Sequence, residues 1–122
     1  MGFAAGAGLG ALGGAIGSAL RYLTVLGAGR LVPGWPVGTL VVNVAGCFVM
    51  GLLFALSGPR NHPLLMTGIL GGFTTFSAFS LDTLKLWEGG APAQAALYTG
   101  ASVVLSLLAC ALGAALARGA LT

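Results

Sequence analysis

The strongest constraint on this chain is its scarcity of charge: its 122 residues include five Lys or Arg and two Asp or Glu. About a quarter of the residues of a soluble domain are charged, because charges keep its surface in water. So few charges cannot solvate the outside of a globule of this size, and 57% of the residues are hydrophobic. The sequence therefore predicts a protein whose surrounding solvent is lipid.

Four apolar segments are each long enough to cross a membrane as a helix, which takes roughly 20 residues. Gly and Pro residues punctuate the boundaries between them. We expect an all-α membrane protein whose helices cover residues 3–26, 37–56, 64–87 and 93–117, with a turn at 27–36 and a loop at 60–63. The first apolar segment lacks the basic start of a cleaved signal peptide, so we expect it to be retained. Residues 1–122 then form a single transmembrane domain.

The basic residues give the chain little bias in orientation. Four spans place both termini and the second loop on one side with Arg60 and Arg118, and leave Arg21, Arg30 and Lys85 on the other. Orientation follows the imbalance of Lys and Arg across the membrane, and two against three is nearly balanced. Such a chain can insert either way up. The net charge of +3 is too small to indicate nucleic-acid binding.

Small residues recur at every fourth position in the first and last spans: Gly6, Gly10, Gly14 and Ser18, then Ala109, Gly113 and Ala117. Faces of this kind let helix backbones approach closely in lipid, within one chain or between subunits. The two cysteines, Cys47 and Cys110, lie in the middle of apolar runs without His or Cys partners nearby. We interpret them as small packing residues rather than as a metal site.

Polar side chains within the spans are expensive in lipid and therefore informative. Thr39 and Asn43 are four residues apart, so they share one helix face. Tyr98, Ser102 and Ser106 form a second stripe at the same spacing in the last span. Such groups can simply link helices by hydrogen bonds of about 0.6 kcal/mol each. Two aligned stripes of uncharged donors in so small a protein instead indicate a lined path.

The third span contains an unusual stretch, Gly71–Ser80, with two Gly, two Thr and two Ser. These residues weaken a helix. Irregular backbone at membrane depth is tolerated only where it is buried in protein or faces a watery cavity. Broken helices there commonly bind ions through exposed carbonyl and amide groups. We therefore expect a break in helix three, with a regular helix carrying a Gly/Thr packing face as the alternative.

The residues also weigh against other functions. The single His, His62, is expected in a loop, and no pair of nucleophile and base can be built, so the chain is not predicted to be an enzyme. A small four-helix multidrug exporter is the main alternative. Such a proton-coupled exporter needs a carboxylate within the membrane, and Asp82 and Glu88 are expected at the end of helix three or beyond. A passive scaffold subunit is a third possibility. The residues themselves indicate only a small uncharged or anionic solute.

Two motifs give a specific resemblance. Gly71–Ser80 is similar to the pattern G-G-x-T-T-F-S-x-F-S, and Gly38–Gly46 to G-T-x-x-x-N-x-x-G. Together with Gly17–Tyr22 and the stripe in the last span, they make the whole chain resemble the CrcB/Fluc family of fluoride channels. One departure is Asp82, where the family more often has Glu.

The resemblance implies a fluoride-specific channel that lets fluoride leave the cytoplasm passively and lowers its intracellular concentration. It implies an antiparallel, dual-topology homodimer in the inner or plasma membrane, with lipid around it, two pores and a central structural sodium ion. The sodium would bind the backbone carbonyls of Gly71 and Thr74, and Arg21 would lie at the aqueous vestibule. The pore would be lined by Thr39, Asn43, Phe76, Ser77, Phe79, Tyr98, Ser102 and Ser106.

These roles agree with the chemistry of fluoride. The ion is small and strongly hydrated, so a pore must replace its lost water with hydrogen-bond donors. Uncharged amides and hydroxyls do this without trapping an ion that must also leave. Aromatic ring edges carry a weak positive quadrupole, so phenylalanine can face an anion edge-on.

Overall fold

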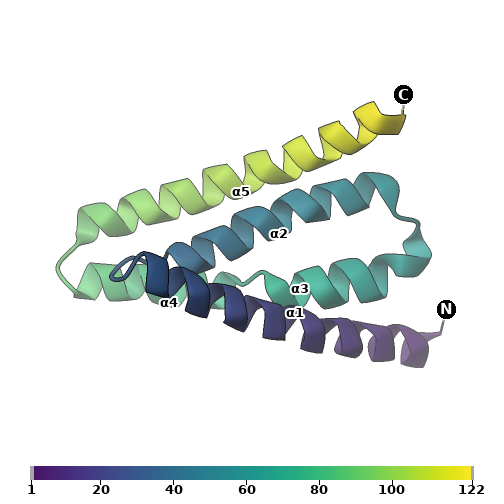
Figure 1. Ribbon diagram of the computed structural model, residues 1–122, viewed down its shortest axis with the longest axis horizontal. Helices are drawn as coiled ribbons and strands as arrows, with labels where there is room; N and C mark the ends of the chain where they lie inside the picture. The colour runs from purple at the N-terminus through teal and green to yellow at the C-terminus, as the bar shows by residue number, and fades with distance from the viewer. Residues whose placement is uncertain (1, 122) are drawn as a thin grey trace.

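The computed structural model describes residues 2–121 and consists of four long helical segments (Figure 1). The first, second and last are single α-helices: α1 (Phe3–Leu31), α2 (Val37–Leu56) and α5 (Pro92–Leu121). The third segment joins a 3₁₀ turn η1 (Pro59–Asn61), a π-helix η2 (His62–Leu70), α3 (Gly71–Phe73) and α4 (Phe76–Glu88). All four segments are long and apolar enough to cross a membrane. The predicted all-α architecture with four apolar spans is confirmed.

Several boundaries differ from those expected, among them the end of α5, which runs to Leu121 rather than to residue 117. Helix α1 continues to Leu31 rather than ending near residue 26. It stops where Pro33 disfavours helical backbone at the residue before it, and Val32 is no longer helical. The expected loop at residues 60–63 is helical, because Pro59 opens η1 at a position where a missing N–H costs nothing. The connection between the second and third segments is therefore only Ser57 and Gly58.

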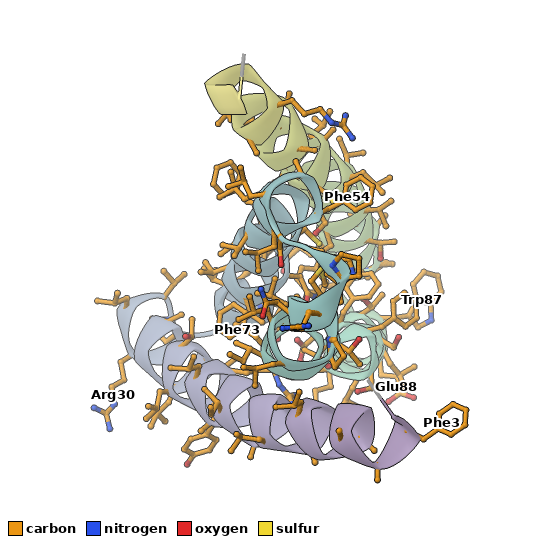
Figure 2. The ribbon with its side chains drawn as sticks, turned by 90° about the vertical axis from the view of Figure 1, so that its right-hand side faces the viewer. Phe3, Arg30, Phe54, Phe73, Trp87 and Glu88 are labelled. Carbon is orange, nitrogen blue, oxygen red and sulfur yellow. The ribbon has the colours of Figure 1, made fainter. Side chains whose placement is uncertain are left out.

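Both termini and the turn from α2 to η1 lie at one end of the bundle, whereas the α1–α2 and α4–α5 connections lie at the other (Figure 1). This arrangement agrees with the side assignment made from four spans. Large apolar side chains cover the outside: Phe3 is 99% exposed and Leu107 68%. Phe3, Arg30 and Trp87 project outward from the helices (Figure 2). A surface this apolar fits a lipid surrounding.

The helices approach closely at glycines. A Cβ atom on Gly51 would contact the carbonyl of Cys110, and one on Gly113 would contact the carbonyl of Phe48, so α2 and α5 pack backbone to backbone. Helix α1 meets the third segment through Gly13 and Gly17, where added Cβ atoms would contact η2.

The small-residue stripe in the first span is therefore not the tightest packing face of α1. A Cβ atom on Gly6 would meet nothing within 4 Å, whereas Gly13 and Gly17, which are also four residues apart but lie outside that stripe, carry close contacts. In the last span the small residues do pack, since Gly113 faces α2 and Ala117 is buried.

Candidate functional site

The third segment is interrupted by two residues with extended backbone. Thr74 has φ −80° and ψ 158°, and Thr75 has φ −155° and ψ 121°. The amide of Thr74 still donates to Leu70 O at 2.9 Å, so the helix ends there. The Thr75 hydroxyl then accepts from the amide of Ala78 at 3.1 Å and caps the N-terminus of α4. Thr74 therefore ends one helix and Thr75 starts the next.

Asn43 of α2 pairs with the backbone of Thr75 through two hydrogen bonds. The Asn43 amide donates from Nδ2 to Thr75 O at 2.9 Å, and Thr75 N donates to Asn43 Oδ1 at 2.7 Å. These bonds satisfy backbone groups that the interruption removes from the helical ladder. Only one of the two Nδ2 hydrogens is used in this pair, so Asn43 keeps a second donor.

Two hydrogen bonds at the interruption leave the carbonyl oxygens of Gly71 and Thr74 without their usual helical donors. In an uninterrupted helix Gly71 O would accept from Thr75 N and Thr74 O from Ala78 N. Here Thr75 N donates to Asn43 and Ala78 N donates to the Thr75 hydroxyl. Carbonyl oxygens are ligands that hard cations accept. The predicted cation ligands Gly71 and Thr74 therefore have a suitable donor chemistry.

A cavity of about 330 Å³ adjoins the interruption. Its wall comes from α2, the α3–α4 interruption, α4 and α5, and consists of Asn43, Cys47, Thr74, Thr75, Phe76, Phe79, Ser102, Val103, Ser106 and Leu107. Five of these residues were predicted for the pore. The Ser102 hydroxyl is buried and has no hydrogen-bond partner among the described residues. The cavity thus combines an apolar wall with a few uncharged donors.

The two candidate pore phenylalanines have different surroundings. Phe79 is 8% exposed, with its ring centroid 5.4 Å from that of Tyr98. Phe76 is 77% exposed, and its ring meets that of Phe79 edge-on with centroids 5.5 Å apart. Both rings contribute to the cavity wall. Phe76 leaves most of its surface outside this single chain.

Other predicted pore residues lie outside the cavity wall. Tyr98 is fully buried and donates its hydroxyl to Asp82 Oδ2 at 3.2 Å, beside Thr39. Ser77 is exposed and forms a hydrogen bond with the Thr75 hydroxyl at 3.3 Å. Asp82 lies in the middle of α4, so its expected place at the end of helix three is wrong. The expected place holds for Glu88, the last residue of α4.

Arg21 lies deeper in its helix than expected. Because α1 runs to Leu31, Arg21 is well inside the helix rather than near its end. The side chain is half-buried, and its Nε donates to Gly72 O at 3.2 Å. A positive charge therefore sits beside the interrupted segment.

Sequence reasoning gave no role to Thr75 and only a packing role to Cys47. Thr75 belongs to the motif Gly71–Ser80, but its backbone pairing with Asn43 became visible only in the structure. Cys47 lies four residues after Asn43, so it shares the same face of α2. That spacing was the available signal that Cys47 faces the cavity, and its interpretation as a packing residue overlooked it.

Comparisons with known proteins now bear on this site. Residues 9–114 match the profile of the family described as CrcB-like protein, Camphor Resistance (CrcB). This chain belongs to the CrcB family. Similar proteins named fluoride-specific ion channel FluC include those of Paracoccus denitrificans, 58% identical, and Cereibacter sphaeroides, 56% identical; each alignment covers 89% of this chain and 91% of the relative. One from Ruegeria sp. is 52% identical, covering 92% and 94%.

Membership in the CrcB family confirms the resemblance seen in the motifs of the second and third spans. The CrcB relatives are named as ion channels, which confirms the prediction that the chain is not an enzyme. With four helices suited to crossing a bilayer, this CrcB protein is a multi-pass membrane protein.

Proposed function

We propose that this CrcB protein is a fluoride channel through which fluoride leaves the cytoplasm passively. The observation that carries the proposal is the cavity beside the interrupted segment, where uncharged donors converge within an apolar wall. Asn43 has an amide hydrogen to spare, and the Ser102 hydroxyl is buried without a partner in the described part of the chain. An ion that must shed water needs such donors, and neutral donors release it again. The names of the relatives supply the identity of the anion.

The test is fluoride efflux from liposomes that contain the purified protein, followed with a fluoride electrode. We expect rapid efflux with the protein, none from protein-free liposomes, and no chloride efflux. Ser102→Ala should slow efflux because it removes the cavity's unpartnered donor. Ser57→Ala is the matched control, since Ser57 lies in the turn between α2 and η1. No flux from folded protein would favour a scaffold, and proton-coupled drug transport would favour the exporter.

We further propose that two copies assemble antiparallel and form two pores. The near balance of Lys and Arg supports dual insertion, and the exposed Phe76 ring beside the cavity supports closure of each pore by a second copy. A tag on the C-terminus should be accessible from both sides of the inner or plasma membrane. A tag found on one side alone would contradict dual topology.

A structural sodium ion between the two copies is the last part of this proposal. Its ligands would be the carbonyls of Gly71 and Thr74, whose helical donors bond elsewhere. A bound ion stabilises the folded state in proportion to its concentration. The melting temperature of the purified dimer should therefore rise as sodium replaces a large organic cation. A melting temperature independent of sodium would contradict this site.

A further inference from the structure

A second cavity, the end hollow, lies where the α1–α2 turn meets α4, at the end of the bundle that carries the α1–α2 and α4–α5 connections (Figure 1). Its volume is about 320 Å³, and its wall consists of Gly34, Trp35, Pro36, Asp82, Lys85 and Leu86. Charged side chains within a membrane protein face water-filled cavities or the bundle interior. The carboxylate of Asp82 and the ammonium group of Lys85 therefore indicate that water reaches the end hollow.

Tyr98 lies between the end hollow and the cavity beside the interrupted segment. It is fully buried and belongs to neither wall. Its ring centroid lies 5.4 Å from that of Phe79, which lines the cavity, and its hydroxyl donates to Asp82, which lines the end hollow. Tyr98 also continues the stripe of Ser102 and Ser106. An ion that follows this stripe toward the end hollow must pass the Tyr98 ring.

Trp35 covers Tyr98 where Tyr98 approaches the end hollow. The two rings meet edge-on, with centroids 6.0 Å apart and planes at 87°. Trp35 is half-buried, and its Nε1 donates to Gln94 Oε1 at 3.1 Å. Gln94 belongs to the first turn of α5, so this bond ties the α1–α2 turn to α5. The bond holds the indole ring against Tyr98.

The turn that carries Trp35 depends on this bond. Gly34 has a φ of 89°, a left-handed conformation that glycine adopts without steric cost. A Cβ atom on Gly34 would meet nothing within 4 Å, so the turn is not packed against the helices at this residue. With open space beside the preceding residue, the indole keeps its place through its own contacts, which are the bond to Gln94 and the edge-on contact with Tyr98.

We propose that Trp35 is a lid on the fluoride path, that Gln94 holds this lid against Tyr98, and that opening of the lid limits the rate at which fluoride passes between the cavity and the end hollow. The inference rests on the proposed channel function. The slowest of several passages in series sets the overall rate, and lid opening is often that step. Trp35 is a positioning residue, because it acts through Tyr98.

The experiment measures fluoride efflux from liposomes for variants that remove either half of the bond. Gln94→Met keeps the length of the side chain but lacks the acceptor, and Trp35→Phe lacks the donor. Each should raise efflux by about two- to tenfold, the ratio that the loss of one aromatic pair implies. Gln94→Glu keeps an acceptor oxygen and should conduct like the natural chain. Trp87→Phe is the matched control and should also do so, because Trp87 is 63% exposed and projects outward (Figure 2).

Two further measurements distinguish an opened lid from a loosened bundle. In the Trp35→Phe background, Gln94→Met should raise efflux no further, because both substitutions remove the same bond. In the Trp87→Phe background, Trp35 is the single tryptophan of the chain. Acrylamide should then quench the fluorescence of the detergent-solubilised protein more strongly once Gln94→Met releases the indole. Chloride efflux should stay absent from every variant.

Each alternative result has a definite meaning. Unchanged or slower fluoride efflux from folded Gln94→Met and Trp35→Phe would overturn the lid. Equal quenching with and without the Gln94 acceptor would also overturn it, because the bond would not hold the indole. Chloride efflux from these variants would reveal a loosened bundle instead of an opened lid. Absence of fluoride efflux from the natural chain would contradict the proposed function and with it the role of the lid in conduction, while quenching would still decide whether Gln94 holds Trp35.

Discussion

Replacing Asn43 by Asp is the sharpest test of how the site works, because the two side chains have nearly the same shape. The carboxylate can still accept from Thr75 N, the 2.7 Å bond in the natural chain. It cannot donate to Thr75 O, which Asn43 Nδ2 reaches at 2.9 Å, or offer a second amide hydrogen to the cavity. The substitution thus removes both donors and adds a negative charge.

The size of the effect follows from these contacts. Leaving Thr75 O without its donor costs about 1–3 kcal/mol of folding stability, which a protein of ordinary stability survives. Two like charges about 4 Å apart repel by about 4 kcal/mol at an effective dielectric constant of about 20. Added to the barrier for an anion passing Asn43, that energy slows passage roughly a thousandfold. Even half of this energy lowers fluoride efflux by well over tenfold.

The assay is fluoride efflux from liposomes, with Asn61→Asp as the control. Asn61 is the other asparagine of the chain, lies exposed in η1 and undergoes the same chemical change away from the cavity. Asn61→Asp should conduct like the natural chain. Circular dichroism and size-exclusion chromatography should show that both variants fold and assemble. If folded Asn43→Asp conducts within a few-fold of the natural chain, the side chain of Asn43 does not face the ion.

Three further substitutions test packing, the helix cap and the aromatic wall. Gly113→Ala should lower stability by about 1–3 kcal/mol, because its Cβ would press on the backbone of α2. The control Gly100→Ala should not lower stability, because a Cβ atom there meets open space. Equal melting temperatures of the two variants would contradict this packing. Thr75→Ala should cost about 1 kcal/mol in melting experiments by removing the cap of α4, and Thr75→Ser should restore it. Phe79→Ile removes a ring that packs against Tyr98 and Phe76, so it should lower stability by about 0.5–1.5 kcal/mol for each lost ring pair. Fluoride efflux from the folded variant should slow by about two- to tenfold, as for a barrier raised by a similar energy; unchanged efflux would return Phe79 to a packing role.

The four spans were predictable from sequence because lipid leaves a chain few options. Scarce charge and long apolar runs require helices that satisfy their own backbone groups, and Gly and Pro mark where they end. Helix ends were less predictable. Gly27 and Gly29 led to the prediction of a turn, yet α1 continues past them and ends only before Pro33. It can do so because a glycine in a helix costs only about 1 kcal/mol.

The candidate site was predictable in its polar residues but not in their pairing. The four-residue spacing placed Asn43 on a face, but the partner of Asn43 is the backbone of Thr75, which has no signature of its own. The sequence predicted that the Tyr98 hydroxyl donates a hydrogen bond to the solute, whereas in the structure this hydroxyl donates to Asp82. Residue spacing shows which side chains lie on the same face of a helix. It does not show which groups they contact, because that depends on the element that packs against the face.

The π-helix before the interruption adds a constraint on chain length. Its turns are wider than α-helical turns, with hydrogen bonds that reach back five residues, as from the amide of Gly71 to Met66 O. Each residue of an α-helix turns the chain by about 100°, and each residue of the wider π-helix turns it by somewhat less. Deleting one residue within His62–Leu70 while the π-helical turns persist would therefore barely shorten the span, but it would rotate the following threonines around the helix axis, away from Asn43. The length of this segment is fixed by rotational phase as well as by bilayer thickness, so we expect natural insertions and deletions in such proteins to fall in the end turns.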